Sequence, residues 1–183
     1  MKNLCYNIIM RNYEKSYIHM KINYSFEELI YEDSFLDNKK IIHEIIIKSI
    51  KTFLNKILIN KIINSKELES YLIRNENNCI CMEYNSKIIG ILVLIENEIN
   101  LIIVDRKYQS KKHLFYLLKY AENMLFWKYK EIKLLSFKEN NKYNRFFEQN
   151  GWKKIEEIYK NEIMYNRYIK ILDIKKATSP NKR

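Results

Sequence analysis

Residues 104–125 read VDRKYQSKKHLFYLLKYAENML and follow the apolar run Ile99–Val104. The pattern predicts a strand that turns through a short basic loop into an amphipathic helix. This order of elements often builds a phosphate site, because the first backbone N–H groups of a helix have no partner within the helix. Phosphate loops commonly contain glycine, which lets the backbone approach the ligand. This loop contains none, so it is either a phosphate site without glycine or a plain turn.

The composition bounds the class of protein. The chain has 183 residues, of which 47% are hydrophobic, and this suits one domain with a proper core. A formal charge of +11 points to an anionic partner. However, most of the excess is lysine, scattered through a chain that holds two glycines and one proline. We interpret the charge as a solvated lysine surface and keep nucleic-acid binding as an alternative.

The cysteines and histidines predict neither a disulfide framework nor a metal site. Cys79 and Cys81 alternate within NNCICMEYN, so they share one face of a predicted strand and suit core packing. The three histidines show no ligand spacing. No apolar run is long enough to cross a membrane, and the N-terminal apolar block is too short for a leader peptide. We therefore expect a cytoplasmic protein.

Hydrophobic periodicity and turn signals predict an alternation of strands and helices. Asp37 or Asn38 is expected to cap the first helix, Ser65 the second, and Gly151 to end the last one. In chain order the predicted elements are strand 17–24, helix 37–58, helix 65–75, strands 78–84, 88–96 and 97–104, helix 111–129, strand 131–137, helix 142–150, and strands 152–160 and 162–172.

This order predicts the fold class. The helix between strands 97–104 and 131–137 indicates a parallel crossover, and the other connections indicate hairpins. We therefore expect an α/β fold with a mixed, mostly antiparallel sheet and helices on both faces. Residues 1–172 are expected to form a single domain, and the polar segment 173–183 a disordered tail.

The element order resembles that of the GCN5-related N-acetyltransferase (GNAT) superfamily over residues 17–172, most specifically over 87–152. Members carry a loop pattern like V-x-P-x-Y-R-G-x-G-x-G, on which VDRKYQSKKHL places Val104, Tyr108, Gln109, Lys112 and Leu114. A later pattern, N-x-x-A-x-x-x-Y-x-x-x-G-F, matches NNKYNRFFEQNGW at Asn140, Tyr143, Phe147, Gly151 and Trp152. Gly90 lies where the family often has a glycine in its third strand. Lys112 and Leu114 replace two loop glycines, and Phe147 replaces a frequent tyrosine.

The resemblance implies acetyl-CoA as co-substrate and no metal. Backbone N–H groups of the loop would bind the pyrophosphate, with Lys111 and Lys112 adding positive charge. The side chains at 112 and 114 are compatible with this only if those residues keep negative φ. His113 is expected at the surface of the first helical turn. The implied cofactor-binding residues are Ile102, Ile103, Val104, Gln109, Ser110, Lys111, Lys112, His113, Leu114, Asn140 and Phe147.

The resemblance also implies two catalytic candidates. Glu98 occupies the position of the base in the histone-acetylating branch of the family, and Glu96 is its alternate. The other interpretation of Glu98 is a turn carboxylate that faces solvent. Tyr143 is the candidate acid for the leaving thiolate, because Phe147 has no hydroxyl, and its other interpretation is helix packing. A backbone N–H near Val104 would stabilise the oxyanion.

The function implied is transfer of an acetyl group from acetyl-CoA to an amine of unspecified class. The first alternative is a non-catalytic GNAT-fold module that binds CoA or a protein. The second alternative is a basic nucleic-acid-binding protein. Against it, the sequence shows neither an aromatic stacking motif nor a dense basic stripe. We expect no membrane partner, and a monomer or a homodimer.

Overall fold

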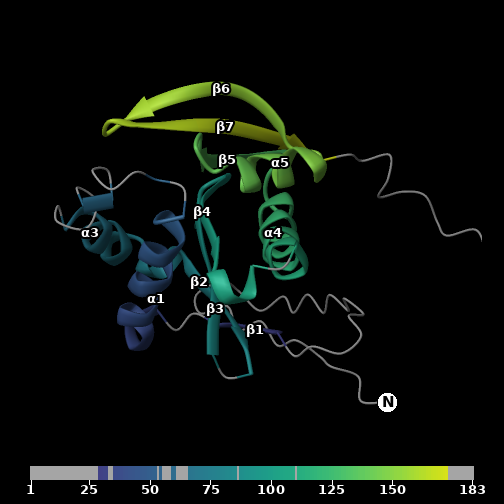
Figure 1. Cartoon of the computed structure of the whole chain (residues 1–183). Helices are drawn as coiled ribbons and strands as arrows, with labels where there is room; N and C mark the ends of the chain where they lie inside the picture. The colour runs from purple at the N-terminus through teal and green to yellow at the C-terminus, as the bar shows by residue number, and fades with distance from the viewer. Residues whose placement is uncertain are drawn as a thin grey trace, which may run out of the picture. The chain divides into compact units, whose positions relative to one another are not determined.

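The structure is a computed structural model that describes residues 29–32, 35–52, 54, 59–60, 66–85, 87–109 and 111–172 (Figure 1). The contacts divide the chain into two compact units. The first, called unit 1, comprises Met1–Val93 and Ile102–Leu117, and the second, unit 2, comprises Leu94–Leu101 and Leu118–Arg183. The expected first strand, 17–24, lies outside the described residues, as does the tail 173–183. The single domain over 1–172 stays a prediction.

Unit 1 holds the N-terminal elements. Its strands run side by side in the order β1-β2-β3-β4, and β1–β2 and β2–β3 pair antiparallel. The elements that lie wholly in unit 1 are β1 (Leu29–Glu32), α1 (Phe35–Ile50), α3 (Glu67–Arg74), the 3-10 helix η1 (Glu76–Asn78), β2 (Cys79–Tyr84) and the 3-10 helix η2 (Arg106–Tyr108). Unit 1 also holds β3 (Lys87–Ile95) as far as Val93, the end of β4 (Glu98–Val104) and the start of α4 (Lys111–Phe126).

The core of unit 1 depends on a close approach at Gly90 in β3. A β-carbon at this position would lie 2.8 Å from Met82 Cε and 3.2 Å from Leu117 Cδ2. The start of α4 therefore packs on the face of the sheet where Gly90 lies. Figure 1 shows α1 and α3 beside the other face of these strands. Cys79 and Cys81 are buried in β2, which confirms their predicted place in the core.

Unit 2 holds the remaining strands in the order β4-β5-β7-β6. Its elements are the start of β4, the end of α4, β5 (Glu131–Phe137), α5 (Asn141–Gln149), β6 (Lys153–Lys160) and β7 (Ile163–Ile171). The pairing of β4 with β5 is parallel, and β5–β7 and β6–β7 are antiparallel. The parallel crossover and the terminal hairpin are therefore confirmed, and so is the predicted fold class.

Helix ends differ from the predictions. The first helix begins at Phe35, so Asp37 and Asn38 lie inside it and do not cap it, and it ends at Ile50 rather than at 58. The end has a local cause: the backbone N–H of Thr52 donates to the Ser49 carbonyl at 3.1 Å, and the Thr52 hydroxyl donates to the same oxygen at 2.7 Å. These bonds satisfy a terminal carbonyl and compete with a further helical turn.

Two other helix boundaries were also misplaced. The second helix is preceded by Lys66 at φ 53° with no side-chain cap, so the cap position is not Ser65. The helix after the basic loop ends at Phe126, three residues before the expected end. Gly151 has φ +83° immediately after α5 and its C-cap residue Asn150, which confirms its predicted role.

None of the helices in the described part of the chain is long and apolar enough to cross a membrane. Within the same described ranges, no group of three or more His, Cys, Asp or Glu residues is arranged to hold a metal ion.

Gly90→Ala should test the close approach of α4 to β3. The added methyl group would lie 2.8 Å from Met82 Cε, the movable end of a flexible side chain, and 3.2 Å from Leu117 Cδ2, so both side chains must shift slightly. Overpacking costs about 1–3 kcal/mol, and we expect the low end of that range here. We expect the free energy of unfolding in urea to fall by this amount. Lys87→Ala, at an exposed position of the same strand, is the matched control and should change it by much less. Equal stabilities of both variants and the parent would contradict this packing.

Candidate functional site

In unit 1 the predicted cofactor-binding segment of β4 is buried. Ile102, Ile103 and Val104 are at most 6% exposed. The Val104 carbonyl accepts hydrogen bonds from Gln109 Nε2 at 3.1 Å and from Ser49 Oγ at 3.4 Å. The strand end is thus tied both to the following loop and to α1. Gln109 acts through its side chain in holding the turn.

The loop between β4 and α4 contains a 3-10 turn that the sequence reasoning missed. The Asp105 carboxylate accepts from the Lys107 N–H at 2.9 Å, and the Tyr108 N–H donates to the Asp105 carbonyl at 2.8 Å. Aspartate is a preferred capping residue, so an aspartate directly after an apolar strand was the feature of the sequence that could have predicted this turn. This turn redirects the chain into α4 without a glycine.

The first turn of α4 meets the condition for a glycine-free phosphate site. Lys112 and Leu114 are helical, and neither has positive φ. The first turn carries no acidic side chain. An acidic side chain there would repel an anion. Lys112 is exposed, with Nζ 5.7 Å from the centre of the Tyr116 ring, whereas Leu114 is buried. Ser110 and the side chain of Lys111 lie outside the described part.

The prediction that His113 lies at the surface is wrong. His113 is 9% exposed, and its Nδ1 lies 3.0 Å from the Tyr108 carbonyl oxygen. Its ring packs against those of Tyr84 and Tyr108, with centroids 5.7 and 6.2 Å away. The loop folds back over the first turn of the helix, and this buries the imidazole. His113 therefore joins the loop to α4.

In unit 2, Glu98 begins β4 and pairs with Lys133 of β5. Its Oε1 atom is buried and has no hydrogen-bond partner among the described residues. Burial raises the pKa of Glu98 above its ordinary value, and the positive charges of Arg167, Lys133 and Lys160 oppose that rise. A half-buried carboxyl favours the base interpretation over that of a solvent-facing turn residue.

Glu96, the alternate candidate, is an exposed turn residue with φ 53°. The parallel ladder that follows the turn is short, because it comprises the pairs Glu98–Lys133 and Ile99–Leu134. All of β5, from Glu131 to Phe137, pairs with β7 on its other edge.

The α5 candidates lie in an aromatic cluster of unit 2. Asn140 is the N-cap, and its side chain accepts from the Tyr143 N–H at 3.3 Å. Tyr143 and Phe147 are 6% and 1% exposed, with ring centroids 6.0 Å apart. Phe147 also packs against Phe146 and Tyr168. This burial favours the packing interpretation of Tyr143. The binding roles of Asn140 and Phe147 stay predictions.

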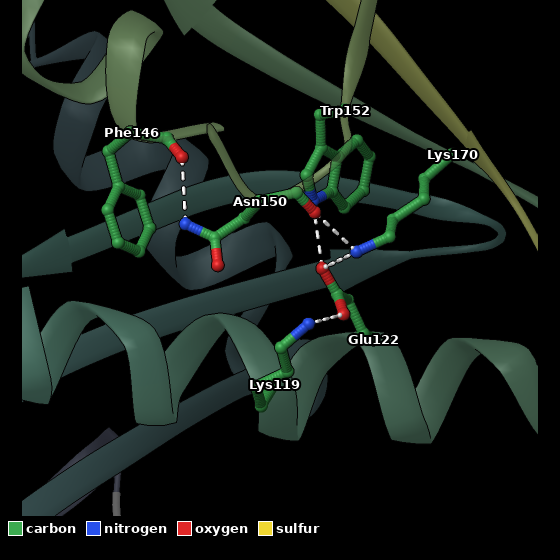
Figure 2. A network of polar contacts seen from close by, with 6 residues as sticks. All are labelled: Lys119, Glu122, Phe146, Asn150, Trp152 and Lys170. Carbon is green, nitrogen blue, oxygen red and sulfur yellow. Dashed lines mark hydrogen bonds and ion pairs between the residues drawn. The ribbon is translucent and has the colours of Figure 1, made fainter. Parts of the chain in front are cut away.

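Unit 2 also contains a buried polar network that the sequence reasoning did not find (Figure 2). Glu122 Oε1 accepts from Trp152 Nε1 at 2.9 Å and from Lys170 Nζ at 2.7 Å, and its Oε2 accepts from Lys119 at 2.7 Å. Lys170 also donates to the Asn150 carbonyl at 2.7 Å. The network connects α4 and β7 to the turn after α5. Trp152, beside Gly151, has a structural role in it because its Nε1–H donates to Glu122.

The comparisons with known proteins agree with the fold. Residues 43–172 match the family model described as an acetyltransferase (GNAT) domain. The chain therefore belongs to the GNAT acetyltransferase family. A search of curated proteins found no match.

Solved structures show the same fold at low sequence identity. A GCN5-related N-acetyltransferase from Rhodopseudomonas palustris has a TM-score of 0.68 and 12% identity, over 81% of this chain and 97% of that one. The PaiA N-acetyltransferase of Thermoplasma acidophilum, solved in complex with coenzyme A, has a TM-score of 0.62 and 20% identity, over 76% and 98%. An N-acetyltransferase from Staphylococcus aureus Mu50 has a TM-score of 0.60 and 10% identity, over 76% and 99%.

Removal of the Glu122 carboxylate should destabilise the protein strongly. Burial lowers the pKa of Lys170, and Glu122 opposes that effect by holding the ammonium charged. Breaking a buried pair by removing one partner costs about 3–5 kcal/mol. We therefore expect Glu122→Ala to lower the free energy of unfolding by about this amount in a urea titration.

Removing both charges, in Glu122→Leu/Lys170→Met, should recover part of that loss, because the Lys170 ammonium is then no longer buried without a partner, and Lys119 is exposed enough to be hydrated. Glu139→Ala, at an exposed glutamate of unit 2, is the control for a simple loss of charge. The network would have no such role if Glu122→Ala behaved like Glu139→Ala.

Proposed function

We propose that the protein is an N-acetyltransferase that moves the acetyl group of acetyl-CoA directly to an amine. Family membership supports the reaction class. The observation of the structure that supports cofactor binding is the start of α4, where Lys112 and Leu114 are helical and no acidic side chain is present. Helix N-terminal N–H groups bind phosphate through the backbone, so side chains in place of glycine do not prevent it.

The residues that would hold the cofactor are the backbone of Gln109–Leu114 for the pyrophosphate and that of Ile102–Val104 for the pantetheine arm. Lys111 and Lys112 add positive charge near the phosphates. When bound, acetyl-CoA supplies an acetyl group on a thioester, which is activated for attack by an amine. Asn140 and Phe147 stay as further candidates on α5.

Glu98 is the proposed general base. The neutral amine attacks the thioester carbonyl carbon, a C–N bond forms, and the C–S bond breaks with the electron pair leaving on sulfur. Glu98 takes the proton that the attacking nitrogen must lose, directly or through water. A backbone N–H near Val104 stabilises the oxyanion. Because Tyr143 is buried in the aromatic cluster, we expect water to protonate the leaving thiolate. A thiol has a pKa near 8.5, so the thiolate can leave without an acid from the protein.

Cofactor binding should appear as a thermal shift. Acetyl-CoA at about 100 times its dissociation constant should stabilise the fold by about 2.7 kcal/mol. Lys112→Glu should reduce the shift, more so at low salt, because it places a negative charge beside the phosphates. Lys153→Glu, at an exposed lysine of β6, is the charge-matched control and should bind normally. The absence of a shift at millimolar acetyl-CoA would refute cofactor binding.

Glu98→Gln should lower kcat by about 10²–10⁴, with the affinity for acetyl-CoA nearly unchanged. The base must be ionised, so kcat/KM of the parent should fall as the pH drops through a pKa raised above the ordinary glutamate range. The variant should lose this acidic limb. Stopped assays of product by mass spectrometry across pH would measure both effects.

Glu96→Gln is the matched comparison, since Glu96 is exposed two residues earlier. It should leave both kcat and the pH profile unchanged. If Glu96→Gln lost the acidic limb while Glu98→Gln kept it, the base assignment would move to Glu96. Binding of CoA without transfer to any amine would support the non-catalytic alternative.

A further inference from the structure

One face of the unit 2 sheet carries both Glu98 and an arginine that the function above does not use. Glu98 pairs with Lys133 of β5, and Leu135, two residues further along β5, pairs with Arg167 of β7. Paired residues on adjacent strands share a face, as do alternate residues along one strand. The side chains of Glu98, Lys133, Leu135 and Arg167 therefore project from the same face.

Arg167 is only partly engaged by the protein. Its Nη1 atom donates to Glu156 Oε1 of β6 at 2.5 Å. Its Nε atom is buried and has no hydrogen-bond partner among the described residues. A buried donor without an acceptor costs free energy, and a guanidinium is well shaped to bind a carboxylate. The Glu156 contact holds the guanidinium in place, while Nε retains its capacity to donate.

Glu98 and Arg167 thus place an unpaired hydrogen-bond acceptor and an unpaired donor on one face, among the described residues. Oε1 of Glu98 needs a donor, such as an amine, and Nε of Arg167 needs an oxygen acceptor. Three cations, Arg167, Lys133 and Lys160, act on the Glu98 carboxyl. Such an excess of positive charge favours a ligand with an anionic group and disfavours a polycation.

The same face is apolar beside these groups. Phe137 of β5 pairs with Tyr165 of β7, and their ring centroids are 5.0 Å apart. Ile158 of β6 pairs with Tyr165 in turn. All three side chains, like Leu135, are half-buried. They form an apolar surface on the face that also bears Arg167.

We propose that Arg167 binds the carboxylate of the acceptor, and that the acceptor is an α-amino acid with an apolar side chain. Its amine would lie at Glu98, its carboxylate at Nε of Arg167, and its side chain against the apolar surface around Phe137 and Tyr165. This inference rests on the proposed acetyl transfer and adds the class of acceptor. Arg167 is a binding residue for the acceptor and takes no part in proton transfer.

The test compares amino acids with their decarboxylated counterparts. The probes are leucine, methionine and phenylalanine, each beside the amine that lacks only the carboxylate, and spermidine as a polycation. Loss of one charge-assisted hydrogen bond corresponds to about 10- to 100-fold in kcat/KM. We expect at least one of the amino acids to exceed its matched amine by this factor, and spermidine to be poor.

Arg167→Gln and Arg167→Lys should remove this preference. The glutamine removes the positive charge and the planar set of guanidinium donors, whereas the lysine keeps the charge and lacks Nε. Both should lower kcat/KM for the amino acid by a larger factor than for its matched amine, so that the ratio of the two values falls towards one. Arg145→Gln, at an exposed arginine of α5, is the matched control and should keep the full preference. Thermal melts of each variant would verify folding.

Two outcomes would overturn the proposal. One is a parent enzyme that acetylates the matched amines or spermidine as well as the amino acids. The other is Arg167 variants that slow amino acid and amine by the same factor, which indicates a structural role.

Failure of the proposed acetyl transfer would look different, since no amine would be acetylated. Calorimetry with the same amino acids then tests the carboxylate site by itself. Binding to the parent that weakens at least tenfold in Arg167→Gln would support the site, and absence of binding would overturn it.

Discussion

The tie between the end of β4 and the start of α4 is the constraint on which unit 1 depends. The Val104 carbonyl accepts from both Gln109 and Ser49, so one atom holds the strand, the loop and α1 together. His113 adds a second tie, because its ring lies against the loop at Tyr108. The reversal of the chain is therefore built from side-chain hydrogen bonds and a 3-10 turn. Glycine is not needed here, because no described residue of this turn has positive φ.

Scarcity of glycine has a consequence throughout the described chain. Positive φ is adopted outside Gly151 by asparagine, glutamate and lysine, at Lys66, Asn85, Glu96, Asn161 and Glu162. A left-handed conformation costs roughly 1–2 kcal/mol for a residue with a β-carbon, and least for asparagine. The chain thus accepts local strain at its turns. It keeps glycine at Gly90, where a β-carbon would lie within 3.3 Å of the Met82 and Leu117 side chains, and at Gly151 after α5.

The sequence predicted the order of elements well, because apolar periodicity marks strands and helices directly. β5, predicted over 131–137, has those bounds in the structure, and the crossover and hairpin follow. Helix ends were poorer, since the stop at Ile50 depends on the Thr52 hydroxyl, which periodicity does not register. The burial of His113 and the orphan atoms of Glu98 and Arg167 arise from tertiary contacts. No pattern in the local sequence reveals such contacts.

The most direct test of the central claim is to observe the backbone amides at the start of α4 when ligand is added. These N–H groups are proposed to hold the pyrophosphate of CoA without any glycine. In ¹H–¹⁵N spectra, CoA should shift the amide signals of Lys112, His113 and Leu114, and pantetheine, which lacks the pyrophosphate, should leave them in place. Unchanged signals with saturating CoA, or equal shifts with pantetheine, would contradict the account.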